Sequence, residues 1–292
     1  MTSHWQPPPP GEASVPAATT GVPAGRFELA FLRHGGRTAV GRQFVSYPFH
    51  LTRPFALDSA IPSLLTVYQQ SSSGGLYRAE RLACRYDIGA RAAAHVTTQA
   101  ATVVHDCHGQ PARQTVEIAL EEDAFLALTP DPLVLFPGAS CVNRLEAKMA
   151  PGAVLLLADA FALHDPLGAA RPFDRLASEV VVRDAAGRLL LRDCFRVTGE
   201  ALVGPSSPVG GWRVVSSFLL LGDPARLPVR EDLAALAPDG HAVAGVSTLP
   251  NGAGWGVRCL AADAVAARRV AELLFSISVR AAFGSAPAPR RK

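Results

Sequence analysis

Short segments in which apolar and polar residues alternate recur along most of this chain, and turn residues separate nearly all of them. In the first, Phe27, Leu29 and Phe31 alternate with Glu28 and Ala30 before a Gly-Gly turn. This period of two is typical of a β-strand with one buried face, and a following Gly-Gly pair indicates a hairpin. The later segments cover residues 64–68, 81–88, 94–98, 115–120, 142–149, 154–160, 179–183, 189–197, 213–221 and 256–260. So many short strands predict an all-β dominated fold of stacked or coiled sheets.

Two segments in the C-terminal half break this pattern and predict helices. Residues 230–237 read REDLAALA, with acidic residues in the first turn, where the helix dipole favours them. Residues 263–283 begin with Asp263 as a candidate N-cap and end before Gly284. We expect the apolar stripe of this second helix to pack on a sheet. Its members are Ala266, Val270, Leu273, Leu274, Ile277 and Ala281.

The two ends of the chain differ in composition from the segment between them. Residues 1–24 contain four consecutive prolines, many small residues and little charge, and such a segment buries too little apolar area to offset its ordering entropy. We therefore expect a disordered Pro-rich leader at 1–24 and a single β-rich domain at 25–284. A basic flexible tail is expected at 285–292.

The distribution of charge argues against a nucleic-acid partner. The net charge of +3 equals the charge of the last three residues, Arg290, Arg291 and Lys292, so the rest of the chain sums to zero. Nucleic-acid binding requires a basic surface that neutralises phosphates.

The chain also has no apolar run of about 18 residues and no signal-peptide pattern in its first 25 residues, so we expect a cytoplasmic protein without membrane contact.

The five cysteines are widely spread and contain no Cys-x-x-Cys pair. Neither a disulfide framework nor a structural zinc site is therefore indicated.

The common catalytic and nucleotide-binding motifs are absent from the sequence. There is no P-loop, no Gly-x-Ser-x-Gly elbow and no His-Glu-x-x-His pair. Gly252, Gly254 and Gly256 lie between two β-like segments, which indicates a hairpin turn and not a dinucleotide fingerprint. We therefore expect no enzyme, with no catalytic and no cofactor-binding residues.

One cluster has metal-binding chemistry: His105-Asp106-Cys107-His108, just before a Gly-Gln-Pro turn. Imidazole and thiolate suit nickel, copper or zinc, but a stable site usually needs a third or fourth ligand, and the spacing fits no established motif. A polar loop is the alternative interpretation. His105, Cys107 and His108 are therefore candidates for weak, transient metal contacts only.

Several separated motifs resemble the urease accessory protein UreD (UreH) family. The most specific is 125–139, FLALTPDPLVLFPGA, in which two apolar strands flank a Pro-Asp-Pro reversal. The others are Arg53-Pro54-Phe55, Gly74-Gly75-Leu76 followed by Arg81-Leu82, TTQAAT at 97–102, Gln114, Ala186-Gly187-Arg188-Leu189, and a C-terminal helix that carries arginines. Tyr77-Arg78-Ala79-Glu80 replaces the family's second glycine pair and aspartate, and a further family segment is not recognisable at 166–174. The chain thus resembles a divergent member.

The resemblance implies a scaffold or chaperone that helps insert nickel into apo-urease. It implies a complex with UreF-type and UreG-type accessory proteins, with nickel passing through the protein and no cofactor tightly bound. Weakly paired ligands such as Glu117, Glu146, His105 and Cys107 would suit such transient contacts, because a tetradentate site would trap the ion.

Two other classes of protein remain open at this point. An unrelated all-β ligand-binding or carbohydrate-active module would usually show paired carboxylates and exposed aromatic residues. Only 7% of the residues are aromatic, and Glu121-Glu122-Asp123 has the composition of a solvated turn. A structural protein that oligomerises through its sheets is compatible with the low charged fraction of 18%.

Overall fold

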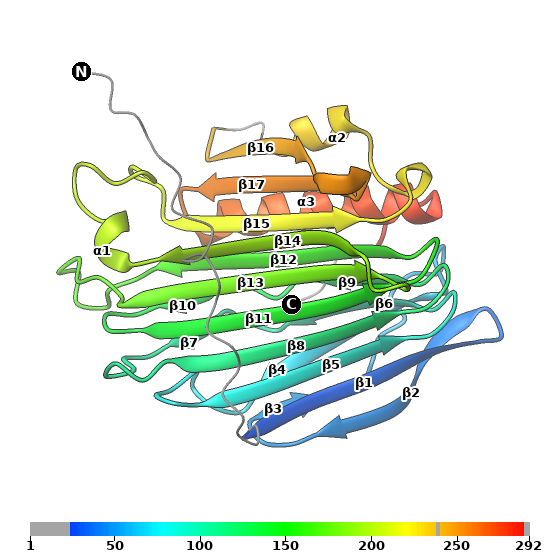
Figure 1. Cartoon of the computed structure of the whole chain (residues 1–292), viewed down its shortest axis with the longest axis horizontal. Coiled ribbons are helices and arrows are strands. Elements are labelled where there is room, and N and C mark those ends of the chain that lie inside the picture. The colour runs from blue at the N-terminus through cyan, green and yellow to red at the C-terminus, as the bar shows by residue number, and fades with distance from the viewer. Residues whose placement is uncertain (1–23, 238–239, 289–292) are drawn as a thin grey trace.

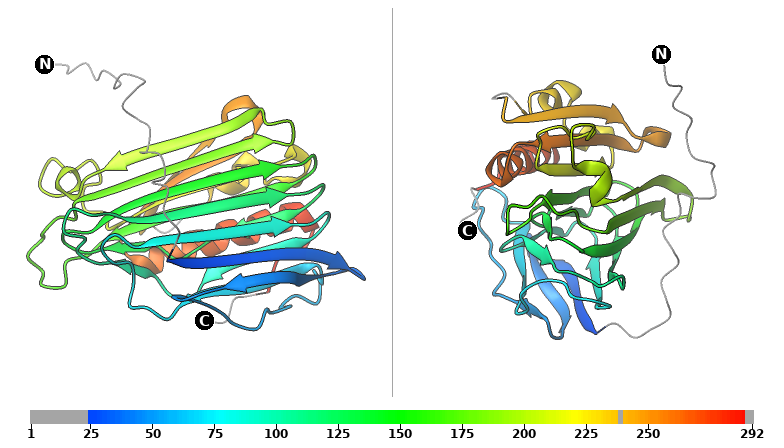
Figure 2. Two further views of the ribbon diagram at one scale, coloured as in Figure 1. Left: turned by 60° about the horizontal axis from the view of Figure 1, so that its bottom comes forward. Right: turned by 90° about the vertical axis from the view of Figure 1, so that its left-hand side faces the viewer.

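The protein is described by a computed structural model that covers residues 24–237 and 240–288. Within these residues, a seven-stranded and a ten-stranded β-sheet lie face to face, and the long helix α3 (Ala264–Phe283) lies on the far side of the ten-stranded sheet (Figures 1 and 2). The expectation of a β-rich fold of stacked sheets is confirmed.

The seven-stranded sheet forms the front layer in Figure 1. Its strands, in spatial order, are β14 (Leu189–Val197), β13 (Arg175–Asp184), β11 (Ser140–Met149), β8 (Ala112–Leu120), β5 (Arg81–Ile88), β1 (Gly25–His34) and β2 (Arg37–Val45). The five inner strands run parallel to one another, and the two edge strands, β14 and β2, are antiparallel to their neighbours.

The ten-stranded sheet lies behind the first one. Its main path is β16 (Ala242–Thr248), β17 (Gly254–Ala261), β15 (Val214–Leu221), β12 (Val154–Leu163), β9 (Phe125–Leu128), β6 (Ala93–Thr98), β4 (Leu64–Ser71) and β3 (Phe49–Leu51). Two further short strands, β10 (Leu133–Leu135) and β7 (Thr102–Val104), extend from β12.

Between β4 and β13 the chain passes back and forth between the sheets. β4, β6, β9 and β12 belong to the ten-stranded sheet, whereas the intervening β5, β8, β11 and β13 belong to the seven-stranded sheet. Each return places a new parallel strand beside the previous one. This alternation explains why strand segments follow one another at short spacing without a strict sequence repeat.

Apolar side chains from both sheets fill the space between them. Phe27, Leu29 and Phe31, the alternating residues of β1, are almost fully buried there with Leu126 and Leu155 of the opposite sheet. A second apolar layer lies between the ten-stranded sheet and α3. The alternation in the first strand therefore predicted the buried face correctly.

The described helices differ in part from the expectation. The helix expected at 230–237 is α2 (Arg230–Ala234), which ends before the expected boundary. The helix expected at 263–283 is α3, and the Asp263 side chain caps it by accepting a hydrogen bond from the backbone N–H of Ala266. A third helix, α1 (Gly199–Leu202), was not predicted, because one helical turn leaves no apolar periodicity. Two 3₁₀ turns occur at Pro224–Arg226 and Pro250–Gly252.

Two further sequence expectations concern the ends of the chain and membranes. Residues 1–23 of the leader expected at 1–24 lie outside the described residues, and so do residues 289–292 of the tail expected at 285–292. No described helix combines the length and the apolar character needed to cross a membrane.

Candidate functional site

A cavity of about 550 Å³ lies between the two sheets. Strands of both sheets and the loops at one end of the molecule contribute to its wall. A cavity of this size lies in the range of small-molecule and cofactor sites. It is the main candidate for a functional site in the described part of the chain.

Several motifs that carry the resemblance to a known family meet at this cavity. Its wall includes Gly74, Gly75 and Leu76, residues 97–102, Gln114, and the Pro130-Asp131 reversal.

Two of these motifs are joined directly by hydrogen bonds. The backbone N–H of Asp131 donates to the Thr98 hydroxyl at 2.8 Å, and the Thr97 hydroxyl donates to the carbonyl of Thr129 at 2.7 Å. The segments 97–102 and 125–139, distant in sequence, therefore form one part of the cavity wall.

Gly75 shows why a glycine is needed in this wall. Its φ is +140°, and a Cβ atom at this position would lie 2.2 Å from the carbonyl oxygen of Val103. The neighbouring backbone N–H of Leu76 donates to that same oxygen at 2.7 Å. Only glycine allows this approach without displacing the backbone.

A row of polar side chains crosses the inner face of the seven-stranded sheet. Gln114 on β8, Asn143 on β11 and Ser178 on β13 are register neighbours, and all three line the cavity. The Gln114 amide donates to the Asn143 side-chain oxygen at 3.4 Å, and the Cys141 thiol donates to the same oxygen at 3.2 Å.

The opposite wall carries a second polar row on the ten-stranded sheet. Asp159 on β12, Ser217 on β15 and Arg258 on β17 are register neighbours. The Ser178 hydroxyl donates to the Asp159 carboxylate across the space between the sheets. At the outer end of the row, the Arg258 guanidinium contacts both carboxylate oxygens of Asp193, at 2.7 and 2.8 Å. This ion pair joins β17 of one sheet to β14 of the other.

Burial raises the pKa of several ionisable groups in and beside the cavity wall. It raises the pKa of the Cys84 thiol to about 12, and it raises the pKa of the Cys141 thiol to about 12 as well. Burial also raises the pKa of the Asp159 carboxyl, and the hydrogen bond from Ser178 opposes this shift in part. Because the thiolate and not the thiol is the strong metal ligand, the two cysteines are weak ligands at neutral pH.

The candidate cluster at 105–108 does not converge into one site. The His105 ring stacks on Tyr77 with a centroid distance of 4.6 Å, and its Nε2 is 3.0 Å from the carbonyl oxygen of Gly74. The Cys107 thiol is fully buried and donates to the backbone carbonyls of His105 and Ser140. The His108 ring is exposed and lies 3.3 Å from the Asp106 carboxylate.

These three candidates therefore face different surroundings. Within residues 24–237 and 240–288, no three His, Cys, Asp or Glu side chains gather as a metal site. Transient contact with a metal through single residues of the cluster stays a prediction.

Glu117 and Glu146 lie away from the cavity. They are register neighbours on β8 and β11 and point to the outer face of the seven-stranded sheet. Glu117 forms an ion pair with Arg85 at 3.2 Å, and Glu146 forms one with Arg144 at 2.8 Å. These two glutamates do not line an internal route.

Sequence patterns alone did not indicate Asn143, Asp159, Ser178 or Ser217 as site residues. One signal was available: Asp159 is the only charged residue in the strand VLLLADAFAL, where an acidic side chain is unexpected. The pairing of Asp159 with Ser178 was not accessible, because it depends on how the two sheets are stacked.

The chemistry of the cavity wall suits loose contact with a cation better than tight binding. Amide, hydroxyl and carboxyl oxygens line the cavity, and burial of its Cys84 thiol raises the pKa of that group to about 12. Such ligands hold a divalent cation loosely, whereas converging thiolates and imidazoles would retain it.

Comparison with known proteins gives a consistent result along nearly the whole chain. The sequence profile of the family described as "UreD urease accessory protein" matches residues 23–292. A protein of Methylorubrum populi named "Urease accessory protein UreD 1" is 45% identical over 96% of this chain and 97% of its own length. A protein of the same name from Pseudomonas syringae pv. syringae is 37% identical over 96% of this chain and 99% of its own length.

Proposed function

Because the chain belongs to the UreD urease accessory protein family and so has a role in urease maturation, we propose that it is a non-catalytic scaffold for nickel insertion into apo-urease. It works in the cytoplasm, in a complex with UreF-type and UreG-type accessory proteins, and docks on apo-urease. The alternative of an unrelated carbohydrate-active or ligand-binding module does not hold, because the family match covers nearly the whole chain.

The observation that carries the proposal is the cavity between the sheets, whose wall includes two rows of polar side chains. Nickel is the cargo, and the cavity is its route through the molecule. The polar rows that include Asn143 and Asp159 offer oxygen ligands along the wall. A route of this kind has to exchange its ligands quickly, which agrees with neutral thiols and separated carboxyl groups.

The energy for assembly comes from a partner in this proposal. The sequence contains no P-loop, so any nucleotide hydrolysis belongs to the UreG-type protein. The chain then contributes the surface that joins the other components. His105, Cys107 and His108 stay secondary candidates for contacts with nickel on its way to the cavity.

Co-purification tests this proposal. The tagged chain is produced together with the urease subunits and the UreF-type and UreG-type proteins of the same cell. We expect the chain to capture the UreF-type protein and, through the assembled complex, apo-urease. A folded chain that captures none of these proteins contradicts the proposed function.

A further inference from the structure

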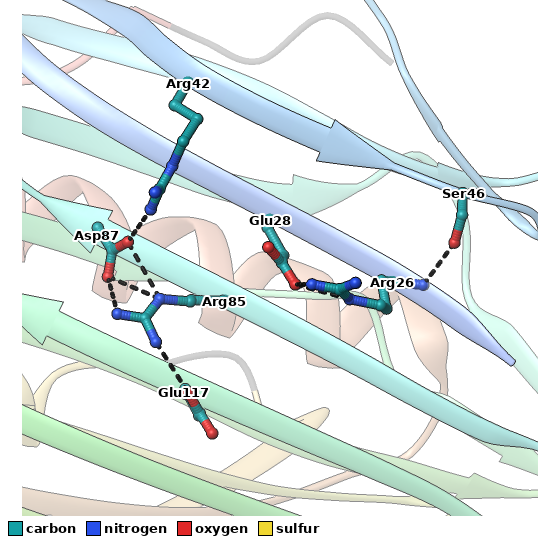
Figure 3. A network of polar contacts seen from close by, with 7 residues as sticks. All are labelled: Arg26, Glu28, Arg42, Ser46, Arg85, Asp87 and Glu117. Carbon is teal, nitrogen blue, oxygen red and sulfur yellow. Dashed lines mark hydrogen bonds and ion pairs between the residues drawn. The ribbon is translucent and has the colours of Figure 1, made fainter. Parts of the chain in front are cut away.

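The outer face of the seven-stranded sheet carries a connected network of ion pairs. The Arg42 guanidinium lies 2.9 Å from the Asp87 carboxylate, which also accepts from Arg85 at 3.0 Å. Arg85 in turn contacts Glu117 at 3.2 Å, so that charges of opposite sign follow one another across β2, β5 and β8 (Figure 3). In the middle of this face the acidic side chains thus have partners within the chain.

Even the like-charge pair in this region is compensated. Glu117 and Glu146 are direct neighbours on adjacent strands, which by itself is unfavourable. Each, however, has its own arginine, Arg85 or Arg144. The fold therefore supplies a counter-charge to both carboxylates.

Two basic pairs on the same face have no such compensation. Arg81 on β5 is the register neighbour of Arg113 on β8, and Lys148 on β11 is the register neighbour of Arg183 on β13. All four residues alternate with buried inner residues and so point outward. None of them forms an ion pair with any residue of the described ranges; Arg183 donates only to the carbonyl of Gly187.

The position of the two pairs is also distinctive. Arg81 and Arg113 lie at the starts of β5 and β8, and Lys148 and Arg183 lie near the ends of β11 and β13. Since Lys148 is level with Ala119 on β8, the two pairs are about 20 Å apart along the strand direction, six residues at about 3.3 Å each. The compensated carboxylates of Glu117 and Glu146 lie between them.

Like charges directly opposite each other in a sheet destabilise the fold. In addition, a mainly parallel sheet usually has both faces covered, whereas here the long helix α3 lies on the opposite side of the molecule (Figure 2). Both observations indicate that the described residues leave the basic pairs on this face without a partner surface.

We propose that the outer face of the seven-stranded sheet docks an acidic protein surface, whose carboxylates lie against the Arg81/Arg113 and Lys148/Arg183 pairs. The inference depends on the proposed function only for the choice of partner. The four basic residues are not part of the cavity wall.

The charge pattern favours a protein over a nucleic acid or a lipid surface. A phosphodiester backbone carries regularly spaced negative charge, which would meet the carboxylates of Glu117 and Glu146 between the basic pairs. A protein surface can place carboxylates at both ends and basic or neutral groups between them. The occupant is therefore a folded protein with two separated acidic groups.

The test variants remove the positive charges of the basic pairs without introducing negative charges. The variants are Arg81→Gln with Arg113→Gln, and Lys148→Gln with Arg183→Gln. The control is Arg268→Gln, which removes one positive charge, ion-paired with Glu272, from α3 on the opposite side of the molecule. Capture of the cognate UreF-type protein and of apo-urease is measured at low and at high salt, and the Tm of each variant is recorded.

We expect each double variant to bind one of these partners at least about tenfold more weakly at low salt, with a Tm equal to or higher than that of the wild type. Wild-type binding weakens at high salt, where charges on the surface are screened. The control binds normally. Unchanged partner binding by both double variants overturns the inference, and weaker binding accompanied by a lower Tm overturns it too, since a structural role would explain that result.

A second arm separates failure of this inference from failure of the proposed function. If the wild type captures none of the cognate proteins, the proposed function fails, and the purified chain is tested with poly-L-glutamate, tRNA and phosphatidylserine vesicles. Binding to poly-L-glutamate that is lost in the double variants supports the docking face. Binding only to tRNA or to vesicles, or to none of the three probes, overturns it.

Discussion

Asp159 is the residue whose chemistry depends most on the stacking of the two sheets. Its carboxyl faces the cavity, and burial raises its pKa above the value of the unfolded chain. The folded protein therefore retains this proton over a pH range in which the unfolded chain has already released it. By linkage, the contribution of Asp159 to stability is most favourable below the unfolded pKa and falls as the pH rises toward the folded pKa.

Replacing Asp159 by Asn removes this titration while keeping a side chain of the same shape for Ser178. We expect the Tm of Asp159→Asn to rise relative to that of the wild type as the pH increases from about 4 to about 7. The measurement is thermal unfolding of both proteins across this range. A constant Tm difference across the range would show that Asp159 is charged in the folded protein.

Asp165 provides a control, because its pKa is shifted in the opposite direction to that of Asp159. The Arg171 guanidinium, 2.7 Å away, and backbone N–H groups hold the pKa of this carboxyl well below its usual range. Its favourable contribution is present above the unfolded pKa and is lost as the pH falls. Asp165→Asn should therefore lose Tm relative to the wild type as the pH increases, and a slope like that of Asp159→Asn would invalidate the comparison.

At the scale of elements, α3 shows how the sequence positions a helix on the ten-stranded sheet. Leu274 is 1% exposed in the layer between helix and sheet, whereas the adjacent Leu273 is 39% exposed. These two leucines form a matched pair, since they share the helix and the residue type and differ in their surroundings.

We expect Leu274→Ala to lower the free energy of unfolding by about 2–5 kcal/mol, because it removes buried methyl groups and leaves a cavity. Leu273→Ala should cost less than about 1 kcal/mol, as is usual for exposed positions. Urea unfolding of the two variants gives both values. Equal losses would mean that the helix does not pack in this orientation.

The same helix shows what sequence periodicity could and could not predict. The N-cap at Asp263 and the buried positions Ala266, Val270 and Leu274 were predicted correctly. Leu273 was expected in the stripe and is exposed, because periodicity does not define where the contact with the sheet ends.

The strand β16 was missed in the sequence, since Gly245 and exposed edge positions weaken its alternation of apolar and polar residues.

At the scale of the molecule, strand alternation predicted which residues face inward, but not which of them meet. Asn143 follows the inward parity of Leu145, so its orientation was accessible from sequence. The pairing of Ser178 with Asp159 and the opposition of Lys148 and Arg183 depend on sheet stacking and register. The zero net charge of the chain outside its last three residues likewise concealed basic pairs on one face.

The family motifs have a common location that their order along the chain did not indicate. The glycine-rich segment at 74–76, the segment 97–102 and the Pro130-Asp131 reversal all line the same cavity. A scaffold for protein contacts alone would not require polar residues around an internal space. Their convergence agrees with a role for the cavity in moving nickel through the molecule.

The most direct test of this role is the nickel content of urease produced with and without the chain. Urease is purified from cells that contain all other maturation proteins, and nickel per active site is measured by mass spectrometry at a limiting nickel concentration. We expect urease made without the chain to contain little nickel, and expression of the wild-type chain to restore it. Equal nickel content in the two preparations would contradict the proposal that this protein takes part in nickel insertion.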